Sequence, residues 1–220
     1  MKLRDDFAIR EHVPFAATPW TPSPEPGVDR KMLERDGAEI ARATSIVRYA
    51  RHSSFAAHTH ERGEEFVVLD GVFSDDHGDY PKGTYVRNPP GSRHRPFSHG
   101  GCTIFVKLRQ FDPGDTRRCV VLPAPAAEPE VGAHAGPVTT LLHAFGSERV
   151  SLVGLAPGAS TTLPENGRGA EILVLAGSMS VGPAHCETWT WLRAPRLAEP
   201  LLSASGCLFW LKQGHLTLPT

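Results

Sequence analysis

The chain has 220 residues, a formal net charge of −1, 40% hydrophobic residues and 21% charged residues. Such a chain can bury a core, and its balanced charge gives no electrostatic reason to expect binding to nucleic acid or to a membrane surface. No apolar run approaches the roughly 18 residues of a membrane span, and the N-terminus lacks the apolar core of a signal peptide. The four cysteines lie far apart without a C-x-x-C pair, which favours reduced thiols and a cytoplasmic protein.

The first 27 residues predict an extended arm, because the segment PWTPSPEPG at 19–27 has too many prolines for a helix. After it, short segments rich in β-branched and aromatic residues are bounded by Gly or Pro, a pattern typical of strands. These segments are 28–35, 41–49, 65–74, 83–90, 102–110, 117–122, 138–145, 149–158, 170–180, 188–195 and 206–213. No stretch keeps an apolar period of 3.6 residues, so the chain is predicted to be nearly all β.

The two halves of the chain are related by an internal repeat. With a shift of 106 residues, SIVRYARHSSF at 45–55 aligns with SLVGLAPGAST at 151–161, and GEEFVVLDGVFS at 63–74 aligns with GAEILVLAGSMS at 169–180. With a shift of 105, GCTIFVK at 101–107 aligns with GCLFWLK at 206–212. Matches at nearly one register predict a tandem duplication of one small β domain.

A candidate metal site lies in the first half, in the stretch HTHERGEE at 58–65. Alternate side chains of a strand face one way, so His58 and His60 point to the same side, and Glu64 has the same parity. His94 follows a proline-glycine turn further on. Three imidazoles and a carboxylate suit one divalent transition metal per chain, such as Fe(II), Zn(II), Mn(II) or Ni(II). The alternative is a polar loop with a surface histidine.

The spacings H-x-H-x3-E-x6-G over 58–71 and G-x5-P-x-G-x2-H over 83–94 resemble the two signature motifs of the cupin superfamily. The resemblance implies an all-β bicupin, with two RmlC-like jelly-roll barrels in tandem. It also implies that the metal ligands are His58, His60, Glu64 and His94. The predicted domains are an arm at 1–27, which packs on a barrel or a neighbouring chain, a metal-binding cupin at 28–125, a linker at 126–134 and a metal-free, degenerate cupin at 135–220.

The second copy lacks all the candidate ligands together. The residues that match them there are Pro164, Asn166, Ala170 and Pro200. Glu65 behaves differently, since its match is Glu171, so we expect Glu65 to serve both barrels through a backbone hydrogen bond or an exposed position. The comparison predicts one metal per chain, in the first half.

The segment GEEFVVLDGVFSDDHGDYPKGTYVRNPPGSRH has a narrower resemblance, to the cupin-like domain of ChrR-type anti-sigma factors. No helical anti-sigma domain precedes it, so binding of a sigma factor is not expected. The same cupin type is similar to small Fe(II) dioxygenases that cleave diketones and related carbonyl compounds. Two hypotheses follow: an oxygenase for a small carbonyl compound, or a non-enzymatic sensory module that responds to an oxidant or a small ligand.

Other residues near the motifs leave both hypotheses open. The candidate pocket walls are Phe66, Val68, Tyr85, Arg87 and Phe105. The matches of Tyr85 and Phe105 to Trp191 and Trp210 in the second copy favour plain core packing for these two. A structural hydrogen bond is the preferred role for Arg87, because Arg193 matches it in the second copy. Cys102 is the candidate redox thiol, although its match Cys207 favours a structural role. The resemblance also implies a homodimer.

Overall fold

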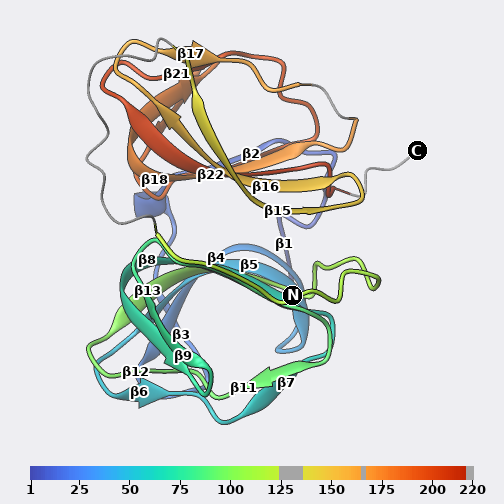
Figure 1. Cartoon of the computed structure of the whole chain (residues 1–220), viewed down its shortest axis with the longest axis vertical. Helices are drawn as coiled ribbons and strands as arrows, with labels where there is room; N and C mark the ends of the chain where they lie inside the picture. Colours follow the sequence, from blue (N-terminus) through green and yellow to red (C-terminus); the bar gives the residue numbers. More distant parts are fainter. Residues whose placement is uncertain (124–135, 165–166, 217–220) are drawn as a thin grey trace. The chain divides into compact units, whose positions relative to one another are not determined.

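The computed structural model describes residues 1–123, 136–164 and 167–216, so the predicted linker at 126–134 lies outside the described residues. The chain divides into two compact units (Figure 1). Unit 1 comprises Met1–Asp5 and Thr18–Ala126, and unit 2 comprises Asp6–Ala17 and Ala127–Thr220. The only helical segment among the described residues is one short 3-10 turn, η1 at Phe15–Ala17, so the prediction of a nearly all-β chain is confirmed.

Unit 1 is built on antiparallel strands in the order β1-β4-β5-β13-β8-β10-β14, with a separate two-stranded sheet of β7 and β11. Its strands are Lys2–Leu3 (β1), Thr21–Pro22 (β3), Val28–Gly37 (β4), Ala41–Tyr49 (β5), Ser53–Ser54 (β6), His58–His60 (β7), Glu64–Asp75 (β8), Gly78–Pro81 (β9), Tyr85–Asn88 (β10), Ser92–His94 (β11), Phe97–Ser98 (β12), Cys102–Leu108 (β13) and Cys119–Val121 (β14).

Unit 2 repeats this design with strands in the order β15-β16-β22-β18-β20-β2. Its strands are Glu11–Val13 (β2), Val138–Phe145 (β15), Glu148–Leu155 (β16), Ser160–Thr161 (β17), Ala170–Val181 (β18), Ala184–Glu187 (β19), Trp191–Ala194 (β20), Leu201–Leu202 (β21) and Cys207–Gln213 (β22). The edge strand β2 comes from the N-terminal arm and pairs with β20, as β14 pairs with β10 in unit 1.

The structure reproduces the internal repeat strand by strand. β8 and β18 have the same bounds after a shift of 106 residues, as do β10 and β20, and β13 matches β22 at a shift of 105. Both long strands carry a bulge at the same place, opposite Thr103/Ile104 in unit 1 and between Val174 and Ala176 in unit 2. The predicted tandem β-barrels are confirmed.

Two glycines show why the repeat keeps certain residues. Gly71 has φ +71° and Gly177 has φ +72°, and a Cβ atom at either would lie 2.2 Å from a backbone oxygen, that of Gly101 or Gly206. Only glycine tolerates this close approach together with a positive φ. The matching strand crossings therefore require glycine in both copies.

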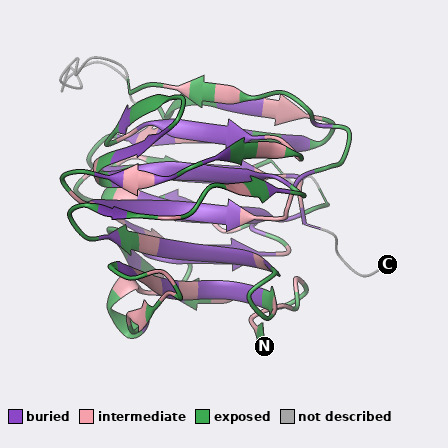
Figure 2. Cartoon of the chain, turned by 90° about the horizontal axis from the view of Figure 1, so that it is seen from below, coloured by how far each residue is buried: buried purple, intermediate pink, exposed green. Residues whose placement is uncertain are grey.

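Each unit has its own apolar core, as the buried strands of Figure 2 show. In unit 1 the core includes Phe66 and Val68 of β8, which pack with Val86, Ile104 and Val106 from the neighbouring strands. In unit 2, Ile172 and Val174 of β18 take the same places. Before the bulge, the even residues of β8 and β18 therefore face the barrel interior, which fixes the side of the sheet on which Glu64 lies.

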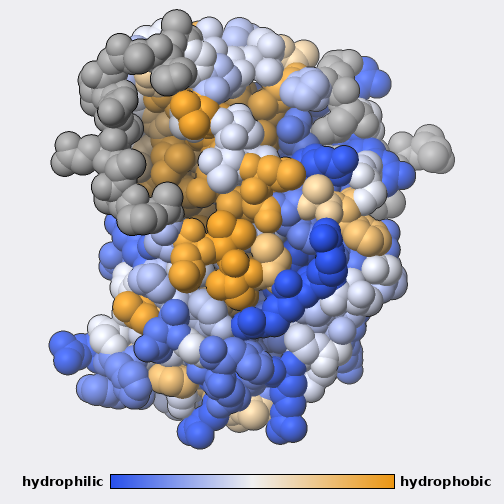
Figure 3. Space-filling view, in the orientation of Figure 1, coloured by the Kyte–Doolittle hydropathy of each residue, from blue (hydrophilic) through white to orange (hydrophobic). Residues whose placement is uncertain are grey.

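Some apolar side chains remain at the surface, and Figure 3 shows one face on which such residues gather beside hydrophilic ones. β15 is an edge strand of unit 2, and its Val138 and Leu141 side chains are each 59% exposed. An edge strand presents unpaired backbone groups to solvent, so this combination favours pairing with another strand.

Candidate metal centre

The three histidines of the sequence motifs converge on one point in unit 1. β7 and β11 pair so that His94 lies directly opposite His58, and His60 lies two residues further along β7. The ring centroids of the three side chains are 4.8 to 5.2 Å apart. Their ligand nitrogens all lie within 4.8 Å of one another, and the Nε2 atoms of His60 and His94 are 2.9 Å apart.

Glu64 completes the cluster from the first residue of β8. Its Oε2 atom lies 3.3 Å from Nε2 of His60 and 3.5 Å from Nε2 of His94. The turn that brings β7 to β8 depends on Gly63, which has φ +77° and whose Cβ would lie 2.4 Å from the ring of Phe111. The structure therefore groups the three predicted histidine ligands and places the predicted carboxylate, Glu64, beside His60 and His94.

The hydrogen bonds around the cluster leave lone pairs directed inwards. Nδ1 of His58 lies 2.9 Å from the carbonyl oxygen of Ala56, and Nδ1 of His94 lies 2.9 Å from Oδ2 of Asp75. Both partners accept hydrogen bonds, so each Nδ1 carries a proton and each Nε2 presents its lone pair. Two such nitrogens beside a carboxylate oxygen repel one another unless a proton or a cation lies between them. The donor set therefore fits a divalent metal.

The carboxylate of Asp75 fixes the state of His94. Burial alone raises the pKa of Asp75, but hydrogen bonds from His94, the His77 backbone and Tyr80 outweigh it and lower the pKa. Burial also lowers the pKa of His94. The hydrogen bond to Asp75 and the charge of Glu64 outweigh this effect, so the pKa of His94 is raised above its usual value. Burial lowers the pKa of His60 and outweighs the charge of Glu64, which acts in the opposite direction.

Two supporting residues, Asp75 and Asn88, were missed by the sequence prediction. Asn88 ends β10 opposite Glu64, and its Nδ2 donates a hydrogen bond of 3.0 Å to Oε2 of Glu64. A signal for both was present in the internal repeat. Their matches in the second copy are Val181 and Ala194, so these polar partners disappear together with the candidate ligands.

The role expected for Glu65 was wrong in its details. Glu65 is 1% exposed, and its Oε2 accepts hydrogen bonds from the Tyr85 hydroxyl at 2.8 Å and from Nη1 of Arg87 at 2.9 Å. It therefore bonds to side chains in the buried interior and does not occupy an exposed position. Arg87 also bonds to Asp115 at 2.7 Å and lies 3.8 Å above the Phe111 ring, which confirms its structural role.

Three of the five predicted pocket walls lie on the wrong face of the sheet. Tyr85 pairs with Val67, Arg87 pairs with Glu65 and Phe105 pairs with Val67, so all three share the face opposite to Glu64. Only Phe66 and Val68 face the barrel interior.

Other aromatic rings surround the histidines instead. Phe55 lies 6.0 Å from His58 and Phe73 lies 6.2 Å from His94, measured between ring centroids. Tyr49 contacts both phenylalanines, and its burial, with the charge of Glu64, raises its pKa well above the usual value. The candidate site therefore has an apolar wall that contains one neutral phenol.

The second copy lacks the candidate ligands at the matching positions that the structure describes. Pro164, Ala170 and Pro200 stand at the matching positions, while Asn166 lies outside the described residues. Glu171 is retained as a buried carboxylate, and its Oε2 lies 3.0 Å from Nε2 of His215. This arrangement parallels Glu65 and supports a role in the fold rather than in metal binding.

Cys102 is a poor redox thiol. Its side chain is buried, and burial raises its pKa to about 11. The thiolate is the reactive form, so this environment keeps the sulfur inert at neutral pH. The structural role favoured by its match with Cys207 agrees with this burial.

Residues 9–112 match the family model of the ChrR cupin-like domain. This part of the chain is therefore similar to a cupin-like domain. Comparison with curated proteins finds no match, but solved structures share the fold along nearly the whole chain. The bacterial pirin YhhW from Escherichia coli in complex with nickel(II) is 14% identical, with a TM-score of 0.74 over 95% of this chain and 100% of that one.

Two further structures extend this likeness. A provisionally assigned dioxygenase from Nostoc punctiforme is 14% identical, with a TM-score of 0.65 over 97% of this chain and 82% of the other. Oxalate decarboxylase OxdC of Bacillus subtilis is 13% identical, with a TM-score of 0.57 over 92% and 76%. At such identities the likeness concerns the fold alone. In the described residues no helix is long and apolar enough to cross a membrane.

Proposed function

We propose that unit 1 of this chain holds one divalent metal through His58, His60, Glu64 and His94 and acts as an oxygenase on a small carbonyl compound, such as a diketone. The observation that carries the proposal is the cluster of inward lone pairs, supported by Asp75 and Asn88 and bordered by aromatic rings. Four protein ligands leave one or two positions open on a five- or six-coordinate ion. A redox-active ion such as Fe(II) would polarise the substrate oxygens and allow reaction with O2.

The residues of the chain would hold the substrate and control its protons. The rings of Phe55 and Phe73 exclude water from the side of the histidines, and the raised pKa of Tyr49 keeps its hydroxyl protonated. Asp75 keeps a proton on Nδ1 of His94, which leaves Nε2 free to bind a metal. Cleavage of a diketone by O2 places both oxygen atoms in the two products, so it requires no external reductant.

The first test is anaerobic purification with elemental analysis, followed by oxygen-electrode assays with acetylacetone and related diketones. We expect about one metal ion per chain and O2 uptake that depends on the diketone. His60→Ala should lose both the metal and the uptake, whereas Asp79→Asn, an exposed change on the neighbouring strand β9, should keep both. Full metal content in His60→Ala would overturn the ligand assignment, and a loaded protein without uptake would overturn the oxygenase proposal.

A sensory module is the second candidate, and the match of residues 9–112 to the ChrR cupin-like domain favours it. Such a module would respond through its metal rather than through Cys102, because that thiol is buried. Measurements of turnover and of metal content after oxidation distinguish the two functions. A sensor shows no turnover but loses its metal or changes its assembly after exposure to hydrogen peroxide, whereas an oxygenase turns over substrate.

We also propose that the chain forms a homodimer through the edge strand β15, whose Val138 and Leu141 side chains are exposed. Pairing of two such strands would cover both side chains and satisfy their backbone groups. Light scattering during size-exclusion chromatography should give the mass of a dimer, and Leu141→Asp should shift it to that of a monomer. A monomer for the unaltered chain contradicts this proposal.

A further inference from the structure

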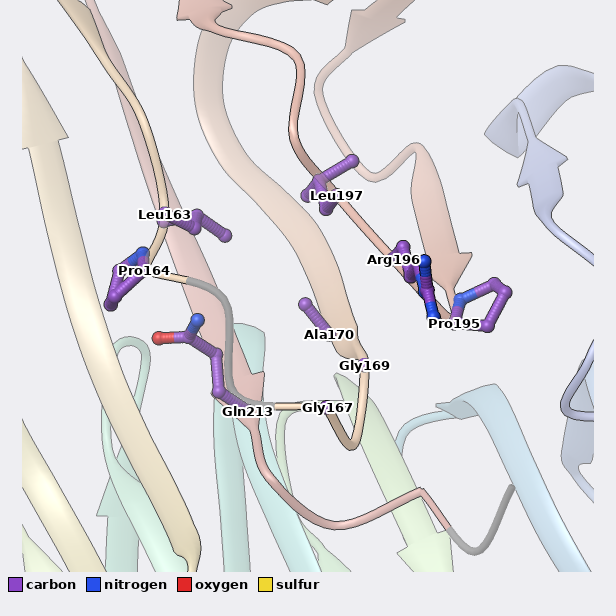
Figure 4. Close-up of a pocket in the computed structure, with 9 residues that line it drawn as sticks. All are labelled: Leu163, Pro164, Gly167, Gly169, Ala170, Pro195, Arg196, Leu197 and Gln213. Carbon is purple, nitrogen blue, oxygen red and sulfur yellow. The ribbon is translucent and has the colours of Figure 1, made fainter. Parts of the chain in front are cut away.

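The metal-free barrel has a cavity at the position that the metal centre occupies in unit 1. This cavity of about 140 Å³ lies within unit 2 and is shown in Figure 4. Its lining includes Pro164 and Ala170, which match His58 and Glu64 in the repeat. Loss of two ligand side chains has therefore left space at the same end of the second barrel.

The chemistry of the lining excludes a metal and favours an organic ligand. None of the lining residues is His, Cys, Asp or Glu, so the cavity has no strong ligand for a divalent ion. In Figure 4, Leu163, Ala170 and Leu197 extend towards the same space from three segments of the chain. The volume is close to the roughly 150 Å³ of a cavity that holds benzene, which sets the size of the apolar group that fits here.

Two polar side chains at the cavity give it a preference for negative charge. Arg196 is exposed and Gln213 is half-buried, and neither side chain makes a hydrogen bond or ion pair with another described residue. A guanidinium group and an amide can both donate to one carboxylate. Gln213 replaces Leu108 of the first copy, and Arg196 replaces Pro90, so both donors are specific to the second barrel.

We propose that unit 2 binds a small monocarboxylate whose apolar part is about the size of a benzene ring. The apolar part fills the cavity between Leu163, Ala170 and Leu197. The carboxylate lies at the opening and accepts hydrogen bonds from Arg196 and Gln213. This site is separate from the metal centre of unit 1, because all its lining residues belong to unit 2.

The test uses the metal-loaded full chain and benzoate as the probe, with benzyl alcohol as a neutral ligand of similar size. Carbon-13 methyl NMR reports on Leu163 and Leu197, so binding at the metal centre does not register as binding here. We expect benzoate to shift these methyl signals with a dissociation constant of about 1 mM or tighter, and benzyl alcohol to bind at least about fivefold more weakly.

Two variants separate the charge from the cavity. Arg196→Gln, an exposed change, should weaken benzoate binding about tenfold while benzyl alcohol is unaffected. Ala170→Leu should fill the cavity and abolish both interactions, with circular dichroism to confirm that the variant is folded. The proposal is overturned if benzoate leaves the Leu163 and Leu197 signals unchanged at about 20 mM, or if Arg196→Gln binds benzoate as tightly as the unaltered chain. These readouts do not depend on the proposed oxygenase activity.

Discussion

The role of Asp75 leads to the most specific prediction, which concerns the variant Asp75→Asn. The carboxylate of Asp75 accepts the Nδ1 proton of His94 at 2.9 Å, and it is buried. The asparagine side chain has nearly the same shape and can still accept that proton through its amide oxygen. The substitution therefore removes the negative charge and leaves the hydrogen bond from His94 in place, although the amide nitrogen of asparagine, at the position of Oδ1, can no longer accept from the His77 N–H.

The expected loss follows from the difference between charged and neutral hydrogen bonds. A hydrogen bond to a charged group contributes about 1.5–3 kcal/mol, and one between neutral groups about 0.5–1.5 kcal/mol. A difference of about 1.4 kcal/mol corresponds to a tenfold change in an equilibrium constant. Asp75→Asn should thus weaken metal binding about tenfold, within the range of about 10–100-fold found for partners of metal-ligating histidines.

The assay is a competition titration against a chromophoric chelator at constant pH, with Asp79→Asn as the matched control. Asp79 is exposed, and its Oδ1 accepts a hydrogen bond of 2.6 Å from Ser74 rather than from a candidate ligand. The control should bind metal as the unaltered chain does. The reasoning is refuted if the metal dissociation constant of Asp75→Asn is also within a factor of about two of that of the unaltered chain.

Three further predictions concern the fold and the other candidate residues. Glu64→Gln should lower metal affinity at least about tenfold. Glu65→Gln should keep full metal content but lower the free energy of unfolding by about 1.5–3 kcal/mol, because buried Arg87 loses one of its two carboxylate partners and keeps Asp115. Equal metal loss in both variants would contradict this, as urea titration and elemental analysis can show. A thiol reagent at pH 8 should modify half-exposed Cys119 well before Cys102, and mass spectrometry that finds the reverse order would refute the assigned burial. Gly177→Ala should lower the melting temperature sharply because its Cβ would lie 2.2 Å from a backbone oxygen, and an unchanged melting temperature would refute the requirement for glycine.

The fold was largely predictable because the repeat carries strong local signals. Glycines at the strand crossings and alternation of apolar residues recur in both copies, and each observed central strand overlaps a predicted segment. The pairing of β2 with β20 could not be predicted in the same way. Three residues are too few to show an alternation of apolar and polar side chains. A short arm can pair with the edge strand of any sheet, so only the tertiary structure selects its partner.

The candidate ligands were predictable, but the walls of the site were not. Alternate residues of a strand share a face, so Glu64, Phe66 and Val68 of β8 lie on one face independently of how β8 pairs with its neighbours. Whether Tyr85 and Arg87 share that face depends on the register between β10 and β8, which one residue of slippage would reverse. The sequence motifs give the spacing between these strands without their register, so the two residues were placed on the wrong side.

The two copies together separate the chemistry of the site from the requirements of the fold. A buried arginine is retained in both barrels, at Arg87 and Arg193, and each is fully buried. Asp75 and Asn88 are also buried polar residues, yet Val181 and Ala194 replace them where the candidate ligands are lost. A buried polar group without a partner is costly, so loss of the ligands removes the reason to retain the residues that orient them. This coupled loss argues that Asp75 and Asn88 serve the metal centre rather than the barrel.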